Sequence, residues 1–101
     1  MSLVEKAIEQ LAVVRKRKGM YFGPRVEDAE SFLDGFRIAL SLTGVPLTRE
    51  SAQRSFERRG WTWSSLRAVP SMAKKGLSEE QIIYELIDAF IDELRELPAG
   101  V

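Results

Sequence analysis

Apolar residues recur at intervals of three or four along most of the chain, the spacing of one face of an α-helix. In the first segment they are Leu3, Val4, Ala7, Ile8, Leu11, Ala12 and Val14. Ser2 and Glu5 have the spacing of a capping box, and Gly19 is expected just past the C-terminal end of this helix. A second helix is predicted from Val26 to Thr43, with Gly44 ending it.

The middle of the chain has a weaker pattern. A third helix is predicted over Arg49 to Arg59, ended by Gly60, although few of its residues are apolar. Between Trp61 and Gly76 the pattern predicts one short helix before Pro70 and a helical turn that begins at Pro70. Proline is accommodated there because the first turn of a helix needs no N–H from it.

The strongest helical pattern lies near the C-terminus. Ser78 and Gln81 have capping-box spacing, and Pro98 stops the helix. Its apolar stripe consists of Ile82, Ile83, Leu86, Ile87, Phe90, Ile91, Leu94 and Leu97. No segment alternates between apolar and polar residues as a strand does. The sequence therefore predicts one all-α domain over residues 1–101, a compact bundle of four or five helices with short loops. Its first, second and last helices are expected to form the core.

Composition excludes several classes of function but does not identify one. The chain has 101 residues, 45% of them hydrophobic, and 15 basic residues balance 15 acidic ones. It has no cysteine and no histidine, which excludes disulfides, thiolate chemistry and histidine-based catalysis. We therefore predict no enzyme activity, no cofactor and no metal. The longest apolar run has four residues, from Leu11 to Val14, so we expect no membrane span and a cytoplasmic protein.

Charge is segregated although its sum is zero. Residues 49–76 hold seven basic and two acidic side chains, whereas residues 77–97 hold seven acidic and one basic. On the last helix, three acids fall within about 60° of Glu85 around the axis and form one face with it: Asp88, Asp92 and Glu96. This acidic face is interpreted as a solvated surface, or as a face that docks on the chain's own basic segment or on a partner.

A basic and aromatic segment precedes it, formed by Arg54, Arg58, Arg59, Trp61 and Trp63. Guanidinium groups suit phosphates and indole rings suit stacked bases, which is one pattern of nucleic-acid binding. Two tryptophans in a small protein are also expected to pack in or near its core. A third alternative is a surface that binds a peptide or protein.

One run resembles a known segment. Residues 14–23 read V-R-K-R-K-G-M-Y-F-G, similar to the V-R-K-R-P-G-M-Y-I-G segment that opens the ATPase domain of DNA gyrase and its type II topoisomerase relatives. The run is also similar to one found in small uncharacterised bacterial proteins. Residues 85–93 resemble the E-x-x-D-N-x-x-D-E helix of the same ATPase domain. That resemblance places Glu85 at the position of the general base. It places Ala89 at the Mg²⁺ position, where a methyl group offers no ligand atom, so no ATPase activity is expected.

The same run has two physical interpretations. In the first, a basic helix end is followed by Met20, Tyr21 and Phe22, which turn inward as an apolar plug. In the second, the basic cluster Arg15, Lys16 and Arg17 binds a partner.

These patterns together favour a non-catalytic protein-interaction module of the adaptor, immunity or regulatory type. It is expected to dock through its basic and acidic helix faces, either to a protein partner or to a second copy of itself. The alternative is a nucleic-acid-associated factor that uses the basic Arg/Trp segment.

Overall fold

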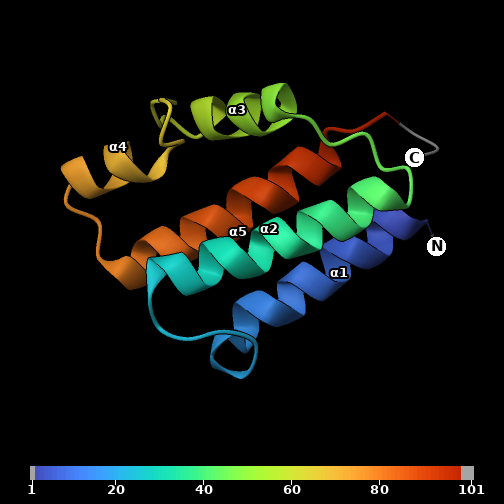
Figure 1. The fold of residues 1–101 in the computed structure, drawn as a ribbon, viewed down its shortest axis with the longest axis horizontal. Coiled ribbons are helices and arrows are strands. Elements are labelled where there is room, and N and C mark those ends of the chain that lie inside the picture. The colour runs from blue at the N-terminus through green and yellow to red at the C-terminus, as the bar shows by residue number, and fades with distance from the viewer. Residues whose placement is uncertain (1, 99–101) are drawn as a thin grey trace.

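The computed structural model describes residues 2–98 (Figure 1). Within that range the chain forms five α-helices and one short 3₁₀-helix, and no strand. The elements in chain order are α1 (Leu3–Lys16), η1 (Lys18–Met20), α2 (Val26–Leu42), α3 (Arg49–Arg58), α4 (Val69–Lys74) and α5 (Glu79–Arg95). The prediction of an all-α bundle is therefore confirmed.

The last helix, α5, is the centre of the bundle. It runs between α1 and α2 on one side and α3 and α4 on the other, and each of these four helices packs against it (Figure 1). Its buried residues are Ile82, Ile83, Leu86, Ile87, Ala89, Phe90, Ile91, Glu93 and Leu94. The expected core of first, second and last helices is present, and the loop and α4 add Ala68 and Met72 to it.

The predicted helix ends agree well with the structure, because they depend on local hydrogen bonds. Ser2 with Glu5 and Ser78 with Gln81 form the expected capping boxes. Gly60 follows α3 with a φ of +91°, a conformation that favours glycine. The N–H of Trp61 then bonds back to the carbonyl of Phe56 at 3.0 Å, as in a Schellman motif. Trp61 is thereby directed towards the bundle.

Two predictions about backbone were wrong. The α1 helix ends at Lys16, and Gly19 lies inside η1 instead of serving as the residue past its end. Residues 61–68 contain no helix before Pro70; they form an extended segment and a turn, with Ser64 and Arg67 paired through their backbones. Both Trp61 and Trp63 pack on the core from this segment.

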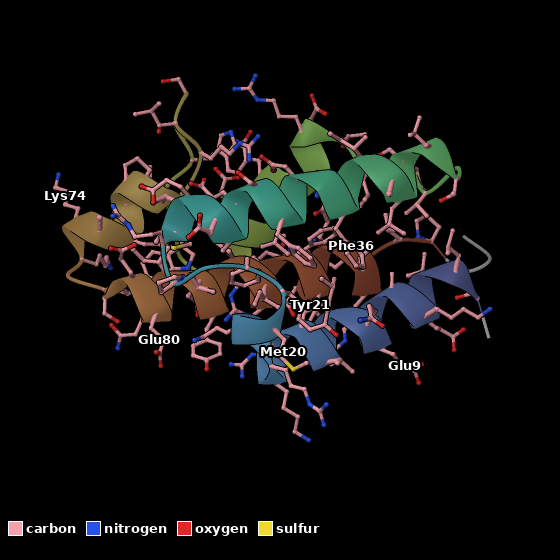
Figure 2. The ribbon with its side chains drawn as sticks, turned by 60° about the horizontal axis from the view of Figure 1, so that its bottom comes forward. Glu9, Met20, Tyr21, Phe36, Lys74 and Glu80 are labelled. Atoms are coloured by element: carbon pink, nitrogen blue, oxygen red, sulfur yellow. The ribbon has the colours of Figure 1, made fainter. Side chains whose placement is uncertain are left out.

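The apolar plug was predicted only partly correctly. Phe22 packs against the core, with its ring centroid 5.5 Å from that of Phe32. Met20, however, is 76% exposed, and Tyr21 is 37% exposed (Figure 2). The 3₁₀-turn of η1 accounts for the difference, because it leaves Met20 on the outer side of the chain while Phe22 reaches inward.

Candidate functional site

The acidic face of α5 is covered by the chain's own arginines. Arg59, at the end of α3, binds Glu85 at 2.8 Å and Asp92 at 2.8 Å. The indole N–H of Trp61 donates to the same carboxylate, that of Glu85, at 2.8 Å. Of the sequence alternatives for this face, the structure shows docking on the basic segment of the same molecule.

The remaining acids of this face have partners as well. Arg15 from α1 makes a two-point contact with Asp88, at 2.7 and 3.1 Å. Its guanidinium also lies 4.6 Å from the ring centre of Tyr84, a cation–π contact. Arg58 binds Glu96 at 2.6 Å. Cations from α1 and α3 therefore meet on α5, so most of the segregated charge is neutralised inside the molecule.

The ion pairs shift the pKa of three residues, Glu85, Arg59 and Arg15. Hydrogen bonds from Arg59 lower the pKa of Glu85 below its ordinary value, although partial burial acts in the opposite direction. The same contacts raise the pKa of Arg59, and a hydrogen bond to Asp88 raises the pKa of Arg15. Both arginines stay charged at any physiological pH.

Other predicted site residues are placed differently. Lys16, Arg17 and Arg54 are exposed, with no carboxylate within 4.0 Å in the part of the chain that the structure describes. Trp61 and Trp63 are both partly buried and pack against the core. The ring centroid of Trp63 lies 5.7 Å from that of Phe56 on α3. The structure brings the candidate cations and aromatics together only at Arg59 and Trp61.

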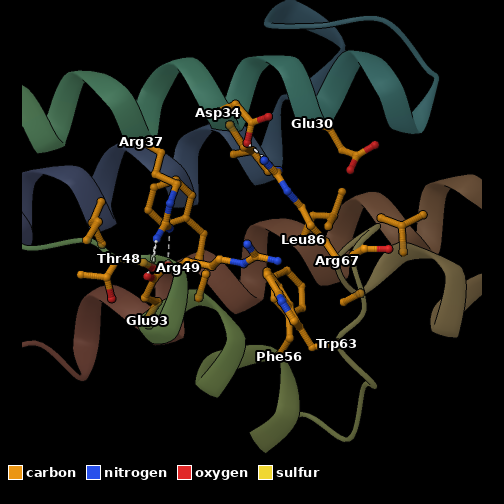
Figure 3. A pocket seen from close by; sticks show the side chains of 17 residues that line it. Glu30, Asp34, Arg37, Thr48, Arg49, Phe56, Trp63, Arg67, Leu86 and Glu93 are labelled. Carbon is orange, nitrogen blue, oxygen red and sulfur yellow. Dashed lines mark hydrogen bonds and ion pairs between the residues drawn. The ribbon is translucent and has the colours of Figure 1, made fainter.

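A cleft of about 470 Å³ lies between α2 and α3, next to these charges (Figure 3). No Cα atom of α2 comes within 8 Å of one in α3, because both helices pack on α5 and not on each other. Leu86 and Phe90 of α5 line its floor, and Leu33 of α2, Phe56 of α3 and Trp63 line its walls. A mostly apolar concavity of this size is typical of a ligand or peptide site.

A buried ion pair lines one end of the cleft. Glu93 of α5 is 2% exposed and is bound by Arg37 of α2 through both carboxylate oxygens. The hydroxyl of Ser51 donates to the same carboxylate, and Arg37 also donates to the carbonyl of Thr48 at 2.7 Å. These contacts join α2, α3 and α5 at a single point.

A second ion pair, which is exposed, also lines the cleft; it joins the turn before α4 to α2. Arg67 binds Asp34 of α2 at 2.9 Å, and their side chains are 54% and 42% exposed. Arg67 has a φ of +67°, a region that a residue with a side chain rarely occupies. Its backbone is held there by two hydrogen bonds with Ser64, at 3.1 and 2.8 Å. An exposed pair of this kind is weak, so it is easily opened.

The cleft also contains polar groups without partners among residues 2–98. The indole N–H of Trp63 is buried and donates to no group. Arg49, at the start of α3, is exposed and has no carboxylate within 4.0 Å, and its side chain extends along the cleft towards Phe56 and Trp63 (Figure 3). Burial raises the pKa of Glu30, against the opposing effect of nearby Arg67. The cleft therefore combines an apolar floor with charged side chains of both signs at its rim.

Sequence reasoning missed most of this site. Only Trp63 was a candidate, whereas Arg37, Arg49, Arg67 and Glu93 were not. One signal was present: Glu93 follows Phe90 by three residues and so stands on the apolar side of its helix. An acid at such a position requires a buried cation, but the pattern could not identify it as Arg37.

Comparison with known proteins found no matching family, no matching curated protein and no matching solved structure. The resemblance to the gyrase segment therefore remains an expectation. In this structure Glu85 lies outside the cleft, bound to Arg59 and Trp61.

Over residues 2–98 no helix is both long enough and apolar enough to cross a membrane. Within the same residues no group of three or more acidic side chains is arranged to hold a metal ion.

Proposed function

We propose that this protein is a non-catalytic protein-interaction module whose binding surface is the cleft between α2 and α3. The observation that carries the proposal is the cleft itself, in which the apolar side chains of Leu86, Phe90 and Phe56 lie beside Arg49, an exposed arginine without a carboxylate partner among residues 2–98. The absence of cysteine suits a reducing compartment, and we place the module in the cytoplasm.

The charged faces themselves are a poorer docking surface than their sequence indicates. A carboxylate that already binds an arginine gains little from a second cation, and breaking the first pair offsets much of that gain. Glu85 and Asp92 are bound by Arg59, Asp88 by Arg15. We therefore assign to these pairs the attachment of α1 and α3 to α5, and to the cleft the attachment of a partner.

A nucleic-acid partner has less support. Arg59 and Trp61 bind Glu85, so neither is free for a phosphate or a base. The exposed cations do not form one surface patch within a single helix. Lys16 and Arg17 lie at the end of α1, whereas Arg54 lies on α3. If nucleic acid were the partner, its binding would fall steeply as salt rises.

The test is affinity purification of the tagged full chain from its native cells, at about 50 mM and about 500 mM salt. Ala52 lines the cleft from α3, so Ala52→Trp fills the cleft, and Ala52→Leu fills it less severely. Arg54→Glu lies on the same helix outside the cleft and is the matched control. Circular dichroism establishes that each variant is folded.

The proposal expects a protein that the wild type and Arg54→Glu capture and that the Ala52 variants lose. Calorimetric titration with that purified protein must then show the same order of affinities. Equal affinity for folded Ala52→Trp contradicts the proposal. So does a loss with Arg54→Glu alone, or a wild type that retains only nucleic acid. Light scattering of the same variants detects whether the partner is a second copy of the chain.

A further inference from the structure

The side of α2 that faces away from the cleft exposes large apolar side chains to water. Ile38 is 62% exposed and Leu42 is 83% exposed. At about 100° per residue, four residues lie within about 60° of one another around the helix axis and form the outer face of α2: Ser31, Gly35, Ile38 and Leu42. The charged residues of α2 beyond Asp28 all line the cleft instead: Glu30, Asp34 and Arg37. The outer face is therefore uncharged.

The rest of the bundle leaves this outer face open. All four of its residues are exposed. Among residues 2–98, α5 is the one helix whose Cα atoms come within 8 Å of those of α2, and it packs on the opposite, buried side of α2. Of the seven exposed large apolar residues in that range, six lie between Leu3 and Leu42 and one is Leu66. The apolar surface left to a partner is concentrated in the α1–α2 half of the molecule.

Gly35 has no explanation within a single molecule. It lies in the middle of α2, where glycine is a poorer helix former than alanine. A Cβ atom added there would meet nothing within 4 Å, and the φ of Gly35 is not positive. A glycine on a helix surface leaves a hollow, which lets another helix approach closely and place a side chain over it. Its position in the outer face therefore fits a second helix that packs there.

The outer face is complementary to itself. Its small residues, Ser31 and Gly35, come first along α2, and its large residues, Ile38 and Leu42, follow. On an antiparallel helix this order is reversed, so the large half of each face would meet the small half of the other. A two-fold axis midway between Gly35 and Leu42 places the Leu42 side chain of each copy over the Gly35 hollow of the other. A second copy of the chain supplies this complement exactly where it is needed.

The charges at the ends of α2 favour the antiparallel arrangement. Glu27 and Asp28 lie in its first turn, whereas its last turn holds no charged residue. A parallel pair would place the two acidic turns side by side, where their carboxylates repel one another. An antiparallel pair places each acidic turn near the uncharged end of the other helix.

We infer that two copies of this chain pair through the outer face of α2, antiparallel about a two-fold axis, with Leu42 of each copy packed on Gly35 of the other. This face is separate from the cleft, so the inference does not depend on the proposed function. Two large side chains from each copy make an interface smaller than the standard size. We therefore expect a weak dimer, half formed at a chain concentration on the order of 100 µM.

The first test is sedimentation velocity of the full chain between about 10 µM and about 1 mM. Gly35→Gln fills the hollow and is expected to raise the dissociation constant of the dimer at least about tenfold. Glutamine is a better helix former than glycine, so the melting temperature of dilute Gly35→Gln should be no lower than that of the wild type. Ala12→Gln, at an exposed position of α1, is the matched control and should leave the dissociation constant unchanged.

The second test exchanges the large and small positions. Gly35→Leu alone sets two large side chains against each other, and Leu42→Ala alone leaves two hollows, so each should weaken the dimer by about tenfold. The double variant pairs a large residue with a small one again, and its dissociation constant should return to within about threefold of the wild type. Positions 35 and 42 of one helix are about 10 Å apart along the axis, so such a rescue must occur between copies.

The outcomes that overturn the inference are distinct. One is a wild type that stays monomeric at about 1 mM; if Gly35→Gln then loses a protein that the wild type captures, the outer face belongs to that protein. Equal dissociation constants for the wild type and Gly35→Gln, or a double variant without rescue, overturn it as well. Ala52→Trp, which fills the cleft, should dimerise like the wild type, and its loss of the dimer would place self-association in the cleft instead.

Discussion

The two sides of α5 differ in the kind of residue that the helices packed there bury. The buried residues that α1 and α2 contribute are all apolar: Val4, Ala7, Leu11, Val14, Val26, Ala29, Leu33 and Leu40. On the opposite side, the only buried residues of α3 are Ser51 and Ser55. Their hydroxyls donate to the carboxylate of Glu93 and to the carbonyl of Ala89. Both sides carry ion pairs to α5, such as Arg15–Asp88 and Arg37–Glu93, and both carry apolar contacts. The difference lies in the buried residues, which are apolar in α1 and α2 and polar in α3.

This contrast indicates where the molecule can respond to its surroundings. Burial of apolar surface is non-directional and depends little on pH or on moderate salt. Ion pairs weaken when salt screens them or when the acid is protonated. The helix with the buried polar contacts, α3, is also a wall of the cleft, so the cleft lies in the more adjustable half. Three substitutions can break or refine this contrast, and the one with the greatest effect on stability comes first.

Leu11→Ala tests the apolar side. Leu11 belongs to α1, which packs on α5, and its side chain is completely buried. Removing that side chain therefore leaves a cavity. We expect the free energy of unfolding to fall by about 3 kcal/mol, measured by urea denaturation. Val13→Ala, at a position that is 42% exposed on the same helix, is the control and should cost under about 0.5 kcal/mol. A similar small loss in both variants would show that α1 is not held by burial.

Glu93→Gln tests the buried polar contacts, which attach both α2 and α3 to α5 at this point. The change removes the charge that binds Arg37 and accepts from Ser51, and it leaves the guanidinium, which is only 24% exposed, without its counter-ion. We expect a loss of about 2 kcal/mol, lower than for a fully buried pair because water reaches Arg37. Hydrogen exchange should quicken most in α3. Glu50→Gln, at an exposed position of α3, is the control; uniform acceleration through α1 and α2 would contradict the contrast.

The third prediction concerns how the free energy of unfolding depends on pH through the Arg59–Glu85 pair. Its effect is the smallest of the three and the most specific. Arg59 lowers the pKa of Glu85 in the folded chain below its ordinary value of 4.5. The stabilisation from this pair is therefore fully present above that value, and it is lost as pH falls through the lowered pKa. Because the pair is about a quarter exposed, we expect under about 1 kcal/mol from it near neutral pH.

The measurement compares the unfolding free energies of the wild type and Glu85→Gln from pH 7 to pH 3. The difference between them should shrink as the medium becomes acidic. The difference between the wild type and Leu11→Ala should stay nearly constant over the same range. A gap for Glu85→Gln that is independent of pH would mean that the carboxylate contributes no charge-dependent stability.

The regular elements were predicted closely from the sequence. The helices expected at Val26, Arg49 and after Ser78 begin there, and the expected glycine endings at Gly44 and Gly60 are present. These features depend on residues within one or two turns of each other, so a local pattern contains them. The segment after Gly60 escaped prediction because its conformation depends on where its two tryptophans pack, which is a property of the bundle.

Local patterns were thus enough to establish that the chain is helical, where most of its longer helices start and stop, and that its acids gather on one face of the last helix. Which side chains contact that acidic face depends on how the helices of the bundle pack. Arg15 and Asp88 are 73 positions apart in the chain, and Arg37 and Glu93 are 56 apart. Whether such charges face water, a partner or each other follows from how the helices cross, which no local pattern encodes. The same crossing separates α2 from α3 and so creates the cleft.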